Sequence, residues 1–173
     1  MTGQKTVITI RGPANSGKTT LANVMAAKII KEQNMSAMML SQDYIRHEML
    51  RMPKSEQRAA SIDLMKKLTA YASGHVDVLV IEGILSAAHH EDFLEYVKAL
   101  YGHGCHSYYI DLSLEETRRR YRKKPREEYE IDCLDQWYGR VDLSAVLEET
   151  VLDGRKTTDQ LAERIYHDLM ERK

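Results

Sequence analysis

Hydrophobic residues in this chain gather in short runs that alternate with longer segments of helical period. Consecutive apolar residues are typical of strands that are buried on both faces of a parallel sheet. The sequence therefore predicts strands over residues 6–10, 36–40, 76–81, 106–112 and 149–153.

The segments between these runs predict amphipathic helices, because their apolar positions recur every three or four residues. The clearest lie at residues 21–29, 55–73, 93–101 and 161–169. We interpret the apolar stripes as core, including Leu100 in the third segment. Thr157, followed three residues later by Gln160, predicts a capping box at the start of the last helix.

Strands that alternate with helices indicate an α/β fold, with a parallel sheet covered by helices on both faces. The 173 residues contain no internal repeat and no low-complexity linker. We therefore expect a single domain over residues 1–173.

Composition narrows the class of protein. Charged residues make up 29% of the chain but the net charge is only −1, so there is no overall bias towards nucleic acid or membranes. No apolar run approaches the roughly 20 residues that span a bilayer, and the first residues carry no apolar signal region. The two cysteines, Cys105 and Cys133, lie far apart. We expect a cytoplasmic protein with reduced thiols.

The stretch ITIRGPANSGKTTLA, residues 8–22, matches the phosphate-loop pattern G-x-x-x-x-G-K-[ST] between a predicted strand and a predicted helix. Glycines let successive backbone N–H groups point at an anion, and the helix adds the positive end of its dipole. Lys18 can reach the β- and γ-phosphates, and the Thr19 hydroxyl can join a Mg²⁺ shell. The predicted nucleotide-binding residues are Gly12, Asn15, Ser16, Gly17, Lys18, Thr19 and Thr20.

Asp43 follows the second predicted strand, in LSQDYIRHEM. Ligands of open parallel sheets bind at the carboxyl ends of the strands, where an Asp can accept the proton of an attacking hydroxyl. Arg46, three positions later, would share its helix face and could hold an anionic part of the acceptor. The competing interpretations are a helix cap for Asp43 and a solvated charge for Arg46.

Glu82 ends the third predicted strand, after four apolar residues in VLVIEGIL. A buried carboxylate needs a cation or hydrogen-bond donors, and a place in the Mg²⁺ water shell would supply them. We therefore predict Thr19 and Glu82 as metal residues, with Glu82 also facing the acceptor. The alternative is a structural carboxylate bound to backbone N–H groups.

Seven of the nine residues from 118 to 126 are basic. One interpretation is a solvated helix face, because Glu115 and Glu116 each precede an arginine, Arg119 and Arg120, by four residues. A second is a nucleic-acid patch. The third, which we favour, is a lid over approximately residues 115–140 that closes on the triphosphate, stabilises the transferred group and excludes water.

Together these stretches resemble the P-loop kinases of small molecules and nucleosides. GPANSGKTTLA is similar to their phosphate loop, LSQD and VIEGIL resemble the uridine kinase branch, and YIDLSLEETRRRYRKK resembles their strand and arginine-rich lid. Asp43 and Arg46 are also spaced as in polynucleotide 5′-hydroxyl kinases. The short interval between Asp43 and Glu82 leaves little room for the hairpin that uridine kinases use, so the acceptor stays open.

The resemblance implies a three-layer α/β/α P-loop kinase fold, with a five-stranded parallel sheet of order 2-3-1-4-5 and an Arg-rich helical lid. It implies ATP and Mg²⁺ as cofactors, with Lys18 and Thr19 on the triphosphate and metal. Asp43 would be the acceptor base, and the lid cations would be Arg119, Arg120 or Lys124. The catalytic residues implied are Lys18, Asp43, Arg119 and Arg120.

The main hypothesis is transfer of the γ-phosphoryl group of ATP to a hydroxyl of a small metabolite or nucleoside, without a membrane partner. A polynucleotide 5′-hydroxyl kinase is the second hypothesis, with nucleic acid as the less favoured acceptor. The third is a regulatory nucleotide-binding ATPase, which is disfavoured because the sequence has neither an Asn-Lys-x-Asp motif nor a Ser-Gly-Gly signature.

Overall fold

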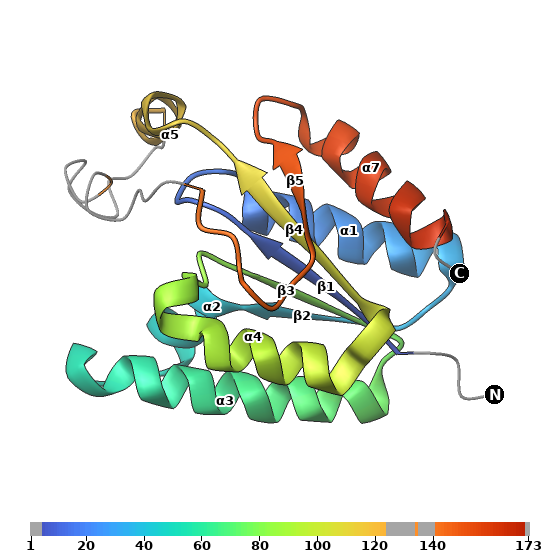
Figure 1. The fold of residues 1–173 in the computed structure, drawn as a ribbon, viewed down its shortest axis with the longest axis horizontal. Helices are drawn as coiled ribbons and strands as arrows, with labels where there is room; N and C mark the ends of the chain where they lie inside the picture. Colours follow the sequence, from blue (N-terminus) through green and yellow to red (C-terminus); the bar gives the residue numbers. More distant parts are fainter. Residues whose placement is uncertain (1–4, 124–133, 135–140, 172–173) are drawn as a thin grey trace.

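The computed structural model describes residues 5–123, 134 and 141–171. Strands and helices alternate along the chain (Figure 1). In chain order the elements are β1 (Thr6–Arg11), α1 (Lys18–Gln33), β2 (Ala37–Ser41), α2 (Gln42–Tyr44), η1 (Ile45–Met49), α3 (Lys54–His75), β3 (Val78–Gly83), α4 (Ala87–Tyr101), η2 (Gly102–Gly104), β4 (Cys105–Asp111), α5 (Leu114–Tyr121), β5 (Glu149–Asp153) and α7 (Thr158–Glu171).

The five strands form one parallel sheet of order β2-β3-β1-β4-β5, which confirms the predicted fold class and strand order. β1 lies at the centre, with Arg11 opposite Gly83 of β3 and Tyr109 of β4. Because all the strands are parallel, their carboxyl ends meet at one edge of the sheet, where the loops that follow them come together.

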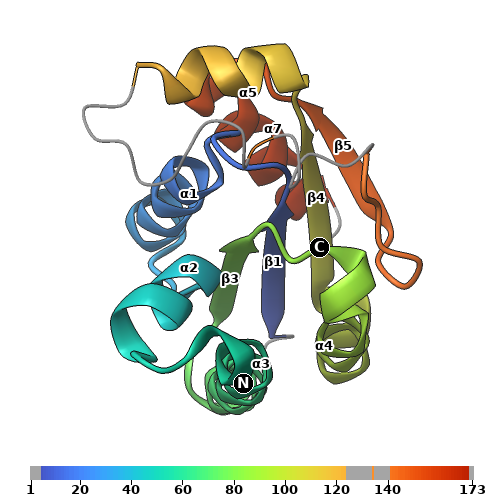
Figure 2. The same cartoon turned by 90° about the vertical axis from the view of Figure 1, so that its left-hand side faces the viewer.

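Helices cover both faces of the sheet: α1 and α7 lie on one face, and α3 and α4 lie on the other (Figures 1 and 2). Alternate strand residues point to opposite faces. Ile8 of β1 therefore joins the core beneath α1 and α7, whereas its neighbour Val7 joins the core beneath α3 and α4. On β3, Val80 likewise joins the core beneath α1 and α7, and Leu79 joins the core beneath α3 and α4.

The predicted continuous burial holds for the inner strands and is wrong at the edges. All six residues of β3 are buried, but Met39 of β2 and Val151 of β5 are exposed. β2 pairs only with β3 and β5 only with β4, so each lies at the border of the sheet, where the covering helices end.

The predicted helices are present, with one error in the core. Gln160 N donates to Thr157 Oγ1 and Thr157 N donates to Gln160 Oε1, which confirms the capping box. Leu100, expected in the core, is 41% exposed, because in the last turn of α4 the buried position is taken by Tyr101 instead.

Of the predicted lid, the structure describes residues 115–123, most of them in α5 (Leu114–Tyr121), and Leu134. Ser113 caps α5 by accepting a hydrogen bond from Glu116 N. Lys124 and most of the remaining predicted lid lie outside the described residues. Within the described part of the chain, no helix combines the length and the apolar character that a membrane crossing requires.

The turn between β5 and α7 contains a glycine that allows close packing against β4. A Cβ on Gly154 would lie 2.6 Å from the backbone oxygen of Asp111. We expect Gly154→Ala to lower the free energy of unfolding by about 1–3 kcal/mol, because backbone must move to relieve the clash. Urea unfolding measures this change.

Gly74→Ala is the matched control. Nothing lies within 4 Å of the position of its Cβ, inside α3. Alanine there should raise stability by up to about 1 kcal/mol through helix propensity. Equal unfolding midpoints for the two variants would contradict the packing argument.

Candidate functional site

The loop between β1 and α1 has the backbone of a phosphate cradle. Gly12, Asn15 and Gly17 have positive φ angles of 146°, 58° and 94°. A Cβ on Gly12 would lie 2.7 Å from the backbone oxygen of Ile110, so this position needs glycine for space as well as for conformation. A non-glycine residue with positive φ, as at Asn15, is typical of loops whose shape serves function.

The first turn of α1 has two features that favour binding of an anion. Its N-cap is Gly17, which has no side chain to bond the first N–H groups, and the first turn contains no acidic residue. The unbonded N–H groups and the helix dipole therefore favour a phosphate at this end. Thr19 and Thr20 are exposed there, whereas Ser16 is buried.

Lys18 folds back over the loop that precedes it. Its side chain is 6% exposed, and Nζ donates to the carbonyl oxygen of Pro13 at 2.7 Å. This position agrees with the predicted role of a fixed cation inside the phosphate loop.

Glu82 lies at the end of β3, opposite Ile10 of β1 and Ser41 of β2, and is 1% exposed. Burial raises its pKa; hydrogen bonding by Ser41 and Thr19 and the charge of Lys18 oppose this rise. Its Oε1 is buried with no partner among the described residues. A carboxylate with a spare oxygen beside a threonine hydroxyl fits the oxygen ligands that Mg²⁺ prefers.

Asp43 lies in the first turn of α2 and is exposed. The cap of this helix is Ser41, whose Oγ accepts a hydrogen bond from Tyr44 N, so the capping interpretation of Asp43 is wrong. Asp43 follows β2 and Glu82 lies near the end of β3, so the parallel pairing of these strands puts both carboxylates at the same edge of the sheet, where the charge of Asp43 raises the pKa of Glu82.

Arg46 lies in η1, three residues after Asp43, and is partly buried. Its Nε is buried without a hydrogen-bond partner among the described residues, which a fully solvated charge would not be. Gln57 of α3 donates a hydrogen bond to the Arg46 carbonyl oxygen and so fixes the backbone at this point.

A buried amide beside Asp43 joins β2, β3 and α4. Gln42 Oε1 accepts from Leu85 N at 3.1 Å, and Gln42 Nε2 lies 2.9 Å from His90 Nε2. His90 Nδ1 lies 3.1 Å from the Ser86 carbonyl oxygen, so the neutral imidazole with its proton on Nδ1 satisfies every contact. Burial lowers the pKa of His90 and favours this form. Sequence patterns pointed to Asp43 and not to Gln42, because only buried contacts distinguish Gln42.

A buried arginine lies directly beneath the phosphate loop. Arg11, the last residue of β1, is 0% exposed. Its Nη1 donates to both carboxylate oxygens of Glu149 at 2.9 and 2.8 Å, its Nη2 donates to Asp142, and its Nε donates to the Leu85 carbonyl oxygen. The guanidinium also lies 5.8 Å from the centre of the Tyr109 ring.

This network extends into the segment before β5. Asp142 Oδ2 also accepts from Ala87 N at the start of α4, and Glu149 also accepts from Ser144 N. Sequence patterns missed it because Arg11 and Glu149 are 138 positions apart, and no local spacing links them.

The two arginines of α5 differ in position. Arg120 donates to the carbonyl oxygens of Ser16 and Gly154 at 3.2 and 2.6 Å, so it lies against the phosphate loop. Arg119 makes two bonds to Glu116 and its side chain is 56% exposed, as expected of a solvated helix face.

The predicted pairing of Glu115 with Arg119 is wrong, because Glu116 takes both arginines. This pairing lowers the pKa of Glu116 to about 2.

The structure therefore gathers Lys18, Thr19, Glu82 and Asp43 at the carboxyl edge of the sheet. Figure 2 faces this edge: α5 lies on one side of it, above the phosphate loop, and α2 and α4 flank it below. The arrangement provides a loop that could hold an anion, oxygens that could hold a metal and a separate exposed carboxylate.

A family model described as AAA domain matches residues 8–149. A search of curated proteins finds no match.

Solved structures share the fold over nearly the whole chain. A sugar kinase from Janibacter sp. HTCC2649 is 17% identical, with a TM-score of 0.69, and covers 94% of this chain and 93% of that chain. A gluconokinase from Sinorhizobium meliloti is 9% identical, with a TM-score of 0.66 and coverages of 97% and 93%. The Mycobacterium tuberculosis APS kinase, in complex with AMPPNP and APS, is 20% identical, with a TM-score of 0.64 and coverages of 97% and 98%. At these identities the likeness shows a shared fold.

The Arg11–Glu149 pair predicts a large and asymmetric effect on stability. We expect Arg11→Met to lower the free energy of unfolding by about 3–5 kcal/mol, because it leaves the Glu149 carboxylate buried without its cation. Adding Glu149→Leu should recover much of this loss. Arg155→Met, which breaks the exposed pair with Asp153, should have a far smaller effect, because solvent screens that pair. Chemical unfolding of the four proteins tests this, and similar losses for Arg11→Met and Arg155→Met would contradict it.

Glu82→Gln should change stability and metal binding in opposite directions. Burial raises the pKa of Glu82 in the folded protein, so its ionised form costs stability as pH rises past the ordinary pKa. The neutral amide should therefore raise the free energy of unfolding at pH 7.

The same substitution should weaken Mg²⁺ binding to the nucleotide-loaded protein by about 10- to 100-fold. In the natural protein this affinity should fall as pH is lowered through the pKa of Glu82, whereas the variant should lose that dependence. Calorimetric titration with Mg²⁺ measures both effects, and unchanged affinity would remove Glu82 from the metal site.

Proposed function

The chain belongs to the AAA domain family, and we propose that it is an ATP-dependent kinase that transfers the γ-phosphoryl group to a hydroxyl of a small metabolite or nucleoside. The observation that carries the proposal is the position of Asp43. It is an exposed carboxylate at the same sheet edge as Lys18 and Glu82, and it does not serve as a helix cap.

The phosphate loop would hold ATP through the residues predicted for it. The N–H groups of the first turn of α1 and the Lys18 ammonium would bind the phosphates. Thr19 and Glu82 would hold Mg²⁺, and when bound, this ion would offset the charge of the phosphates. Glu82 would hold its ligand rigidly, because β3 pairs on both sides.

In the transfer step, the acceptor oxygen would form a bond to the γ-phosphorus as the bond from that phosphorus to the β–γ bridging oxygen breaks. The hydroxyl proton would pass to the Asp43 carboxylate, and ADP would leave with the electron pair of the broken bond. Arg120 would be the lid cation nearest the transferred group, because it is already bonded to the Ser16 carbonyl. Arg119 and Lys124 would then serve the lid less directly.

Small acceptors are favoured by the structural neighbours. The names of the sugar kinase, the gluconokinase and the APS kinase all describe kinases of small molecules. A uridine-like nucleoside and a 5′-hydroxyl polynucleotide therefore enter the test as competing acceptors.

The experiment compares ADP release with free phosphate release across a panel of hydroxyl acceptors. A kinase forms ADP only with its acceptor and releases no matching free phosphate. Free phosphate that matches ADP without any acceptor would instead support the regulatory ATPase, and activity confined to a 5′-hydroxyl oligonucleotide would support the polynucleotide kinase.

Asp43→Asn should lower kcat by at least about 100-fold, because the amide cannot accept the proton, while ATP affinity changes little. Lys18→Ala is the contrasting variant, since it should weaken ATP binding as well. Turnover of Asp43→Asn equal to that of the natural protein would remove Asp43 as the base.

A further inference from the structure

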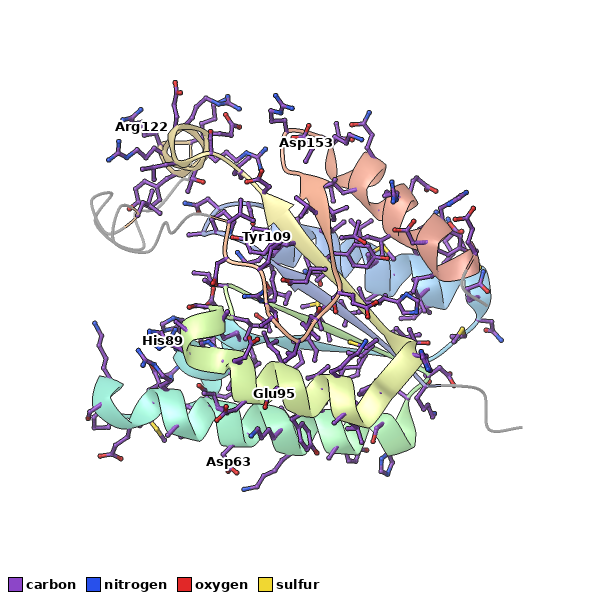
Figure 3. The ribbon with its side chains drawn as sticks, in the orientation of Figure 1. Asp63, His89, Glu95, Tyr109, Arg122 and Asp153 are labelled. Atoms are coloured by element: carbon purple, nitrogen blue, oxygen red, sulfur yellow. The ribbon has the colours of Figure 1, made fainter. Side chains whose placement is uncertain are left out.

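Three basic residues lie on three elements that pack against one another near Asp43, since α3 contacts both η1 and α4. Arg46 lies in η1, Arg58 in the second turn of α3, and His89 in the first turn of α4. Figure 3 labels His89 on the side of the molecule to which α2 and the first turn of α3 also extend. Sequence patterns gave no reason to link Arg58 or His89 to the site.

Hydrogen bonds between neighbouring residues fix this arrangement. Gln57, which precedes Arg58, donates to the carbonyl oxygens of Arg46 and Leu50. His90, which follows His89, is bonded to Gln42 at 2.9 Å. The backbones that carry the three basic side chains are therefore tied to one another at the carboxyl edge of the sheet.

The charges of these three basic residues all affect one neighbour, the imidazole of His90. Burial lowers the pKa of His90, and the positive charges of His89, Arg46 and Arg58 lower it further. His90 itself is turned inward, with both ring nitrogens occupied. The exposed members of the group are Arg58 and His89.

Within the described part of the chain, the two arginines of this group are not paired with acidic side chains. No ion pair there involves Arg46 or Arg58, and the Nε of Arg46 is buried without a partner. Glu91, the nearest acid along α4, bonds Ser144 and Ala145 of the segment before β5 instead. A surplus of guanidinium groups held by rigid backbone is the usual way in which proteins bind carboxylates and phosphates.

We propose that Arg46, Arg58 and His89 form a binding subsite for an anionic group on the acceptor, so that the substrate is a small hydroxyl compound bearing a carboxylate or phosphate. This inference rests on the proposed kinase function. Positions three apart on a helix have Cβ atoms about 5–6 Å apart, which places the anionic group only a few bonds from the hydroxyl that faces Asp43. A small hydroxy acid or sugar phosphate has this size.

The first experiment uses acceptor pairs that differ only in charge: glycerate against glycerol, and glucose 6-phosphate against glucose. We expect the anionic member of a productive pair to have a kcat/KM at least about 100-fold higher. Arg58→Gln should raise KM for that acceptor by about 10- to 100-fold, as expected for a lost charged hydrogen bond. Equal turnover of charged and neutral members would overturn the inference and leave the kinase proposal intact.

Arg164→Gln is the matched control. It removes one arginine charge from α7, where Arg164 is paired with Asp168, and it should leave the acceptor KM unchanged. An equal rise in KM for Arg164→Gln and Arg58→Gln would show that only net charge matters, which would contradict a specific subsite.

A second measurement needs no turnover. With AMPPNP and Mg²⁺ on the protein, inorganic phosphate or acetate is titrated while the imidazole NMR signals of His89, assigned with His89→Gln, are followed. A saturable shift that is lost in the Arg46→Gln/Arg58→Gln double variant supports the subsite. No saturable shift, or the same shift in the double variant, overturns it. Failure of AMPPNP to bind would contradict the kinase proposal separately, and the His89 signals would still report anion binding at the subsite.

Discussion

The guanidinium of Arg11 is the constraint on which the rest of the site depends. It is wholly buried at the end of the central strand, directly before the phosphate loop, and it is bonded to groups from three other segments. A charge without water must have fixed partners. Glu149, Asp142 and the Leu85 carbonyl therefore fix the end of β1 from which the phosphate loop begins.

Through these bonds, parts of the chain with different tasks share one anchor. Leu85 lies just after the strand that carries Glu82, and Asp142 also bonds the start of α4, the helix that carries His89. The loop that would hold ATP and the helix that would face the acceptor are thus positioned from the same point. A site that handles two substrates needs such rigid alignment, because small displacements are costly in transfer reactions.

Much of the fold could be predicted from the sequence because its signals are local. The apolar runs of buried parallel strands, the helical spacing between them and the Thr157–Gln160 capping box each depend on a few adjacent residues. The same holds for the phosphate loop, whose glycines have the positive φ angles that their spacing predicts. Asp43 and Glu82 were placed by a general rule about the ends of parallel strands.

What the sequence did not reveal depends on contacts between distant segments. The partner of Arg11 is 138 positions away, and Gln42 is distinguished only by its bonds to Leu85 and His90. The two arginines of α5 look equivalent in sequence, yet one lies against the phosphate loop and the other bonds Glu116 within its own helix. The direction of each side chain, which the tertiary fold sets, separates them.

The order of the strands also has a consequence for how the protein is made. The central strand β1 is synthesised before both of its neighbours in the sheet and before the acid that neutralises its last residue. Until Glu149 is synthesised, the growing chain contains the whole phosphate-loop motif but lacks the carboxylate that pairs with Arg11 beside it. Its apolar strands also lack some of their neighbours in the sheet during this time. Loss of the segment that carries Asp142 and Glu149 would therefore disturb the phosphate loop from a distant part of the chain, without altering any residue in the loop.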